Sequence, residues 1–231
     1  MILLSNIQDE TELITDSEST EKTLSIIELI SSGGLAGQLI IAILFILLIA
    51  VIYIYFERLF AIKAASNVDS NFMNQIKDHV SNGKTESAQM LCAQVNTPVS
   101  RLINKGITRI GKPLEDINTA IENAGRLELY GLEKNVSVLA TISSIAPMIG
   151  FLGTVIGMIL SIFEIANSGG QIDIKQLSDG LYTAMTTTVA GLIVGIVAYT
   201  AYNHLVVRTD KVVYQMESNS LVFLDHLNEP I

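Results

Sequence analysis

The chain has 231 residues, of which 49% are hydrophobic and only 16% charged, and its 23 acidic and 14 basic side chains give a formal net charge of −9. A mean hydropathy of +0.46 is too apolar for an ordinary soluble domain and indicates a membrane protein. The acidic balance, with no basic stripe along a helix face, excludes a nucleic-acid-binding protein, and a single cysteine, Cys92, excludes an internal disulfide.

Residue types that carry catalysis are scarce. The three histidines, His79, His204 and His226, are scattered and have no second ligand at metal-binding spacing. No nucleophile–base pair is visible, and SNGKTES lacks the first glycine that a phosphate-binding loop requires. We therefore expect no metal, no cofactor and no enzymatic activity.

Residues 1–33 form an acidic segment rich in Ser and Thr, which we expect outside the cytoplasm. Its start, MILLSNIQDE, has no basic region before the short apolar run, so we expect no cleavable signal peptide. Residues up to Thr23 have the composition of a disordered segment. The stretch LSIIELI at 24–30 predicts a short amphipathic helix on the outer membrane surface.

Three uncharged runs are long enough to cross a bilayer. The first, LAGQLIIAILFILLIAVIYIYF, has 22 residues and spans roughly 33 Å as a helix, about the thickness of one hydrocarbon core. We predict transmembrane helices at 34–56, 135–163 and 180–207. The predicted fold class is an all-α integral membrane protein with three transmembrane helices and long cytoplasmic helical extensions.

The basic residues predict the orientation of these helices. One Lys or Arg lies in 1–33, ten in 57–134, one in 164–179 and two in 208–231. Because cytoplasmic segments carry the excess of basic residues, the loop 57–134 and the tail 208–231 are predicted to be cytoplasmic. The N-terminus and the hairpin 164–179 are then periplasmic.

The cytoplasmic segments are predicted to be helical throughout. Pro98 in TPVSRLI is expected near a helix N-terminus, and the glycine in SNGK is expected to separate two short helices. After Pro113, an amphipathic pattern continues without a breaker into the second membrane run, which predicts one helix of about 50 residues. The tail after Val207 repeats this design, and both extensions are expected to bundle beneath the membrane.

Small residues form a stripe on each of the last two membrane helices. In the second they follow one another at steps of three or four, as do those of the third, so each set shares a helix face. The second helix carries Ser143, Pro147, Gly150, Thr154, Gly157 and Ser161, and the third carries Gly180, Ala184, Thr187 or Thr188, Gly191 and Gly195.

Two interpretations of these stripes stay open. Small residues let membrane helices pack closely, which is the structural alternative. The functional alternative is that the stripes, repeated around a ring of subunits, line a cavity that holds water or a partner helix. Thr183 and the run Thr186, Thr187 and Thr188 favour a pore, because a helix that faces only its neighbours rarely collects so many hydroxyl groups. Threonine does not titrate near neutral pH, so the carboxylate that carries a proton must come from elsewhere.

The segments APMIGFLGTVIGM and GLYTAMTTTVAGLIVGI resemble the MotA/TolQ/ExbB family of proton-channel subunits, and most of all its ExbB members. The resemblance covers roughly residues 34 to 227. It implies a homo-pentamer in the bacterial inner membrane that encloses an ExbD-like single-pass partner with a membrane aspartate. It also implies that the proton motive force energises a TonB-like protein. By this resemblance, Thr154 and Thr188 match the family's pore threonines.

One position departs from the family pattern. Many ExbB members have a glutamate where this chain has Thr183, so the expected pore wall lacks that titratable group. Either the partner's aspartate suffices, or the path differs in its outer half, or Na+ is the permeant ion, since hydroxyl and carbonyl oxygens coordinate it. A TolQ-like or other stator-type motor subunit and a passive oligomeric scaffold are the alternative functions.

Overall fold

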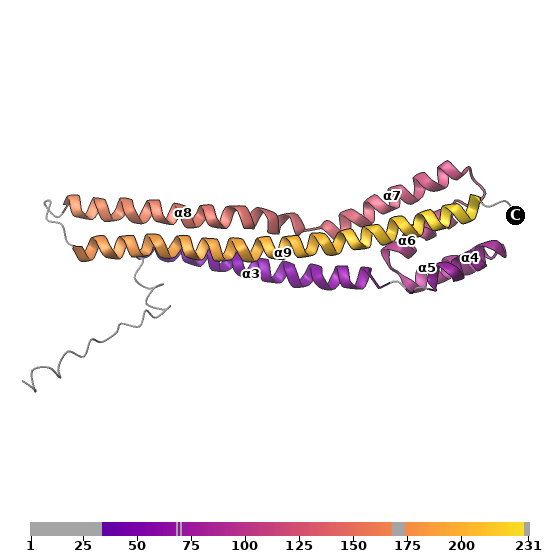
Figure 1. Cartoon of the computed structure of the whole chain (residues 1–231), viewed down its shortest axis with the longest axis horizontal. Helices are drawn as coiled ribbons and strands as arrows, with labels where there is room; N and C mark the ends of the chain where they lie inside the picture. The colour runs from indigo at the N-terminus through magenta and orange to yellow at the C-terminus, as the bar shows by residue number, and fades with distance from the viewer. Residues whose placement is uncertain (1–33, 68, 70, 168–173, 229–231) are drawn as a thin grey trace, which may run out of the picture.

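The computed structural model describes residues 34–67, 69, 71–167 and 174–228, and every regular element in these residues is a helix. The amphipathic helix predicted at 24–30 lies outside the described residues. The helices, labelled as in Figure 1, are α3 (Gly34–Ala65), α4 (Phe72–Ser81), α5 (Thr85–Val95), α6 (Pro98–Ile107), α7 (Leu114–Glu133), α8 (Val136–Asn167) and α9 (Ile174–Asn228).

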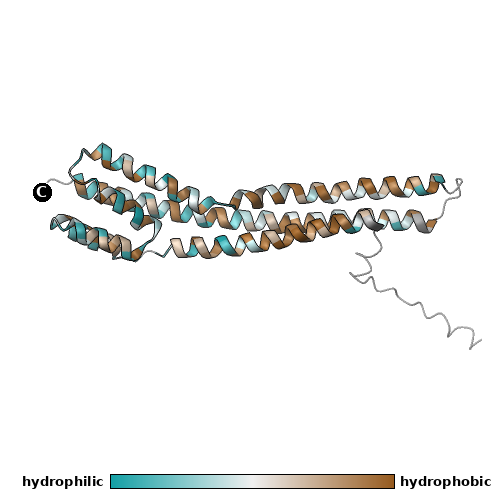
Figure 2. Ribbon diagram, turned by 180° about the vertical axis from the view of Figure 1, so that it is seen from behind, coloured by the Kyte–Doolittle hydropathy of each residue, from teal (hydrophilic) through white to brown (hydrophobic). Residues whose placement is uncertain are grey.

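Three of these helices are long and apolar enough to cross a membrane, over the ranges Ala36–Ala65, Val136–Asn167 and Leu177–Asn228. They form one end of an elongated molecule in which α9 runs the whole length, with α8 and α3 beside it (Figure 1). Large apolar side chains are exposed at this end, among them Leu39, Phe45, Phe151 and Ile193. The ribbon of these three helices is largely coloured as hydrophobic (Figure 2). An outer surface of this kind suits lipid, whereas it would be costly in water.

The helices reach beyond the predicted membrane segments. α3 continues nine residues past position 56, and α8 and α9 extend four and six residues into the predicted hairpin 164–179. α9 is a single helix of 55 residues and rises about 83 Å. The third membrane run and the tail are therefore one continuous rod.

At the other end, α4 to α7 pack around the last part of α9. Buried residues from each helix form one apolar core there, among them Ile76 of α4, Cys92 of α5, Ile103 of α6, Ile121 of α7 and Phe223 of α9. As predicted, Pro98 begins a helix, and Thr97 caps it. The Thr97 side chain accepts a hydrogen bond from the Ser100 N–H, and the Ser100 hydroxyl oxygen accepts one from the Thr97 N–H at 2.9 Å.

The expectation of one helix from Pro113 into the second membrane run is wrong. α7 ends at Glu133, Lys134 has an extended ψ of 130°, and Asn135 has a φ of 63° before α8 begins. Asparagine occupies the left-handed region more readily than most residues, so Asn135, together with the extended Lys134, reorients the chain without a proline or glycine. Beyond the break α7 runs at an angle to α8, whereas α8 lies alongside α9 (Figure 1).

Candidate functional site

The backbones of α8 and α9 touch along a line of small residues, which we call the glycine seam. A Cβ atom added to Gly191 would lie 2.6 Å from the Ala146 carbonyl oxygen and 2.9 Å from the Gly150 Cα. A Cβ added to Gly150 would lie 2.8 Å from the Thr187 carbonyl oxygen. Because these neighbours are backbone atoms, neither position has room for a larger residue unless the helices separate.

The seam continues toward both ends of α8. A Cβ on Gly157 would lie 3.2 Å from the Gly180 carbonyl oxygen and 3.3 Å from the Ala184 Cβ. In the other direction, a Cβ on Gly195 would lie 2.7 Å from the Pro147 ring. The small residues predicted as a pore or packing face therefore all lie in this contact: Pro147, Gly150, Gly157, Ala184, Gly191 and Gly195.

Two of the predicted pore threonines are buried inside the subunit. Thr187 is fully buried against Gly153 of α8, and its hydroxyl donates to the Ala184 carbonyl oxygen at 2.9 Å. Thr183 is 7% exposed and faces α3, since a Cβ on Gly37 would lie 2.6 Å from the Thr183 methyl group. In one protomer these two side chains pack the three helices together.

Thr154 and Thr188 lie instead on the rim of the glycine seam, and both are half-buried. The Thr188 hydroxyl donates across the seam to the Gly150 carbonyl oxygen at 3.2 Å. In a regular helix that same carbonyl accepts the Thr154 N–H, so the two threonines belong to one level of the helix pair. Thr183 and Thr188 point about 140° apart on α9, so the Thr188 rim faces away from α3.

The hydroxyl groups on this rim are oriented by the backbone. Thr154 donates its proton to the Phe151 carbonyl oxygen at 2.6 Å, and Thr188 donates to that of Gly150. A threonine hydroxyl has one proton to donate and two acceptor lone pairs. Both side chains therefore keep acceptor capacity after their own protons are engaged.

The rim has no acid or base of its own. Apart from His204, 16 residues beyond Thr188, no Asp, Glu, Lys, Arg or His lies between Lys134 and Glu164 or between Asp179 and Arg208. Thr154 is about 15 Å along α8 from Glu164, and Thr188 is about 14 Å along α9 from Asp179. At this level the chain offers hydroxyl and carbonyl oxygens as acceptors, but it has no Asp, Glu, Lys, Arg or His side chain to carry a proton.

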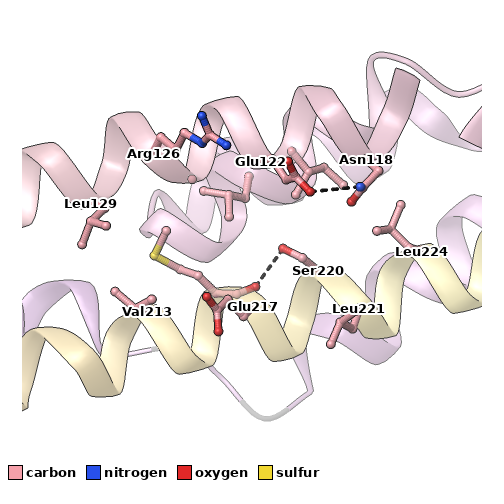
Figure 3. Close-up of a pocket in the computed structure, with 13 residues that line it drawn as sticks. Asn118, Glu122, Arg126, Leu129, Val213, Glu217, Ser220, Leu221 and Leu224 are labelled. Atoms are coloured by element: carbon pink, nitrogen blue, oxygen red, sulfur yellow. Dashed lines mark hydrogen bonds between the residues drawn. The ribbon is translucent and has the colours of Figure 1, made fainter. Parts of the chain in front are cut away.

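The cavity in Figure 3 lies far from this rim, between α6, α7 and α9. It holds about 580 Å³, has Leu102, Ile121 and Met216 in its wall, and carries Glu122, Arg126 and Glu217 at its edge. Asn118 donates to Glu122 at 3.1 Å there. Within the described ranges, no three His, Cys, Asp or Glu side chains are grouped to hold a metal ion. Nothing in this cavity connects it to the threonines.

Sequence reasoning missed Gly153 and Gly37, the glycines that accommodate Thr187 and Thr183. Gly153 lies between Gly150 and Gly157 at the same three-to-four spacing. This spacing could have indicated that Gly153 also faces α9. Gly37 had no such indication, because α3 carries no small-residue stripe that marks its partner.

Comparisons with known proteins agree on one family. Residues 94–218 match the profile of the MotA/TolQ/ExbB proton channel family. The Tol-Pal system protein TolQ of Haemophilus influenzae is 30% identical over 210 residues, which cover 82% of this chain and 87% of TolQ. A biopolymer transport protein ExbB homologue of Methanothermobacter thermautotrophicus is 25% identical over 194 residues, 84% of this chain and 67% of the homologue. Biopolymer transport protein ExbB of Helicobacter pylori is 40% identical over 79 residues, 34% of this chain and 54% of that protein.

Proposed function

The chain belongs to the MotA/TolQ/ExbB proton channel family, and on this premise we propose that it is a ring-forming, ExbB-like subunit of an ion-driven motor in the bacterial inner membrane. Several copies, in the family pattern five, surround the transmembrane helix of an ExbD-like partner. The periplasmic N-terminus and cytoplasmic C-terminus follow from the distribution of Lys and Arg.

The observation that carries this proposal is the pair of oriented hydroxyls at Thr154 and Thr188. Their protons are engaged by backbone carbonyls, and their lone pairs remain available as acceptors on the rim of the seam. A protonated carboxyl group of the partner donates to such an oxygen, and a released cation is solvated by it. The ring thus supplies a polar wall, and the partner's membrane aspartate supplies the titratable group.

The buried positions of Thr183 and Thr187 reduce the number of threonines that we assign to the ion path from four to two. In this protomer both pack against neighbouring helices, so Thr154 and Thr188 are the residues that we assign to ion passage and partner contact. Thr183 and Thr187 support them by fixing α9 against α3 and α8. Many ExbB members have glutamate at the Thr183 position, and in this chain the residue there contributes packing. We keep protons as the favoured permeant ion, with the partner's aspartate as the titratable group.

Ion flow provides the energy for mechanical work. One charge crossing about 100 mV releases about 2.3 kcal/mol, so a few ions outweigh several interfacial contacts. We propose that this energy moves the enclosed partner relative to the ring and energises a TonB-like protein for outer-membrane transport. The alternative to TonB-dependent transport is a TolQ-like role in the cell envelope, which uses the same membrane arrangement. The alternative permeant ion is Na+, if the hydroxyl and carbonyl oxygens alone select the ion.

The test is ion flux in proteoliposomes that contain the chain and its ExbD-like partner. Thr154→Val and Thr188→Val remove the acceptor oxygens with little change in volume. Each is expected to lower flux about 10- to 150-fold, because a lost hydrogen bond to a charged group costs about 1.5–3 kcal/mol. Thr154→Ser and Thr188→Ser keep the oxygen and should retain most of the flux. Thr186→Val is the matched control, because its hydroxyl bonds to the Tyr182 carbonyl on another face of α9.

The same experiment separates a motor from a passive scaffold. A scaffold that only oligomerises has no ion-dependent activity for these variants to alter. The small residues that a scaffold would use for oligomerisation already contact each other within one subunit, along the glycine seam. Unchanged flux in both valine variants rejects the ion-path assignment.

A further inference from the structure

A basic cavity lies where α3 and α9 leave the uncharged part of the bundle. It holds about 910 Å³ between the last turns of α3 and the middle of α9. Lys63, Arg208 and Lys211 line it together with the apolar side chains of Leu59 and Ile62. The cavity lies where charge returns to α9, because Arg208 is the first Asp, Glu, Lys or Arg of this helix after Asp179.

The three cations have no acidic partner in the part of the chain that the structure describes. The salt bridges found there join Glu57 to Arg58 and Glu128 to Arg101, and no carboxylate lines the cavity. The chain as a whole carries a net charge of −9. Three cations that face one cavity without a carboxylate give it a local positive potential, which attracts an anion.

An apolar groove of about 410 Å³ adjoins this cavity on the side of the membrane-spanning residues. Val51, Phe56, Ile196 and Val197 line it, and His204 lines both the groove and the basic cavity. Every residue of the groove lies in the uncharged runs of α3 and α9. From Val51 to Lys63 the helix rises about 18 Å, slightly more than half of a hydrocarbon core of about 30 Å.

His204 connects the two parts. The Arg208 Nε donates to the His204 Nε2 at 3.4 Å, and the His204 Nδ1 shares a hydrogen bond of 2.8 Å with the Tyr55 hydroxyl group. The contacts run from α9 to α3. They hold the Arg208 guanidinium close to the mouth of the apolar groove.

We propose that the cavity and the groove together bind one anionic phospholipid. Its phosphate lies among Lys63, Arg208 and Lys211, and its acyl chains lie in the groove between α3 and α9. A free phosphate would use the cations and leave the groove empty, and an acidic peptide would not enter an apolar groove at membrane depth. Basic pockets between transmembrane helices are suited to anionic headgroups, above all in the cytoplasmic leaflet, where the Lys and Arg count places this end.

Lipid titration of the detergent-solubilised full chain, followed by native mass spectrometry, tests the proposal. The probes are dioleoyl phosphatidylglycerol, dioleoyl phosphatidylcholine and inorganic phosphate. Wild-type protein should retain the phosphatidylglycerol in preference to the phosphatidylcholine. Each of Lys63→Gln, Arg208→Gln and Lys211→Gln should weaken this binding about fivefold, and the triple variant about 100-fold. Lys105→Gln removes an exposed charge on α6 and serves as the control.

A second pair of variants tests the groove. Thr200→Trp fills it from an exposed position of α9, whereas Ile193→Trp adds the same bulk at an exposed position outside it. The first should weaken phosphatidylglycerol binding at least tenfold, and the second should leave it unchanged. Equal binding of both lipids, or no loss in the triple variant, overturns the proposal. Displacement by millimolar phosphate with no effect of Thr200→Trp assigns the site to a free anion and overturns it as well. The comparison of lipids on wild-type protein remains decisive if a variant does not fold.

Discussion

Gly191→Ala is the smallest change that tests the glycine seam. Its new Cβ would lie 2.6 Å from the Ala146 carbonyl oxygen and 2.9 Å from the Gly150 Cα, where ordinary contacts are 3.4 Å or more. The helices must therefore separate by about 0.5 Å or more at this level. Overpacking of this kind costs about 1–3 kcal/mol, and the better helix propensity of alanine offsets up to about 1 kcal/mol of it.

The separation also affects Thr188. Its hydrogen bond to the Gly150 carbonyl is already 3.2 Å long, so the same shift takes it to about 3.7 Å, where it no longer counts as a hydrogen bond. Loss of an interhelical hydrogen bond in a membrane protein adds about 0.6 kcal/mol. The net expectation is a loss of about 2 kcal/mol in the free energy of unfolding.

Equilibrium unfolding in mixed micelles, titrated with dodecyl sulfate and followed by circular dichroism, measures this loss. Gly131→Ala is the matched control, because a Cβ at Gly131 in α7 has no neighbour within 4 Å. That variant should be as stable as the wild type or more stable by up to about 1 kcal/mol. If Gly191→Ala is stabilised to the same extent, the backbones of α8 and α9 are not in contact and the description of the seam is wrong.

Two further predictions concern Cys92 in α5 and the break between α7 and α8. Burial raises the pKa of the Cys92 thiol to about 12, so the thiolate is depleted below that pH. Its alkylation by iodoacetamide at pH 8 should be about three orders of magnitude slower than that of a free cysteine, and equal rates in native and denatured protein would show that the thiol is not buried. Asn135 has a φ of 63°, so Asn135→Val should cost about 1–2 kcal/mol in the same unfolding titration while Asn135→Gly costs little. Equal stability of the two variants would mean that α7 and α8 are continuous.

The broad fold was predictable because its main determinants are local. Uncharged runs of helical length identify membrane-spanning helices, and Thr97 followed by Pro98 has the pattern of a helix start. The break between α7 and α8 was not predictable in this way. It depends on one asparagine in a left-handed conformation, and an asparagine within an amphipathic pattern usually stays helical.

The candidate site was predictable in part. The spacing of Gly150, Gly157, Gly191 and Gly195 placed them on shared faces, but periodicity does not say whether such a face meets its own subunit, another copy or a partner. The four threonines showed the same difficulty. Thr187 and Thr188 are adjacent in sequence, yet one is fully buried and the other is half-buried on the rim. Which hydroxyl belongs to which surface depends on how α3, α8 and α9 pack, and a single helical pattern does not contain that information.

The central claim is that the Thr154 and Thr188 side chains line a wetted cavity that holds a partner helix. Because Cys92 is the only cysteine, a Cys92→Ser background permits single-cysteine labelling in native membranes with a charged, water-soluble methanethiosulfonate reagent. Thr154→Cys and Thr188→Cys should react, and co-expression of the ExbD-like partner should protect both. Thr183→Cys, which faces α3, and Ile193→Cys, on the apolar outer surface, should not react. If the cysteines at 154 and 188 stay as unreactive as those at 183 and 193, with or without the partner, these threonines are sealed against lipid or dry helices and the proposed ion path does not exist.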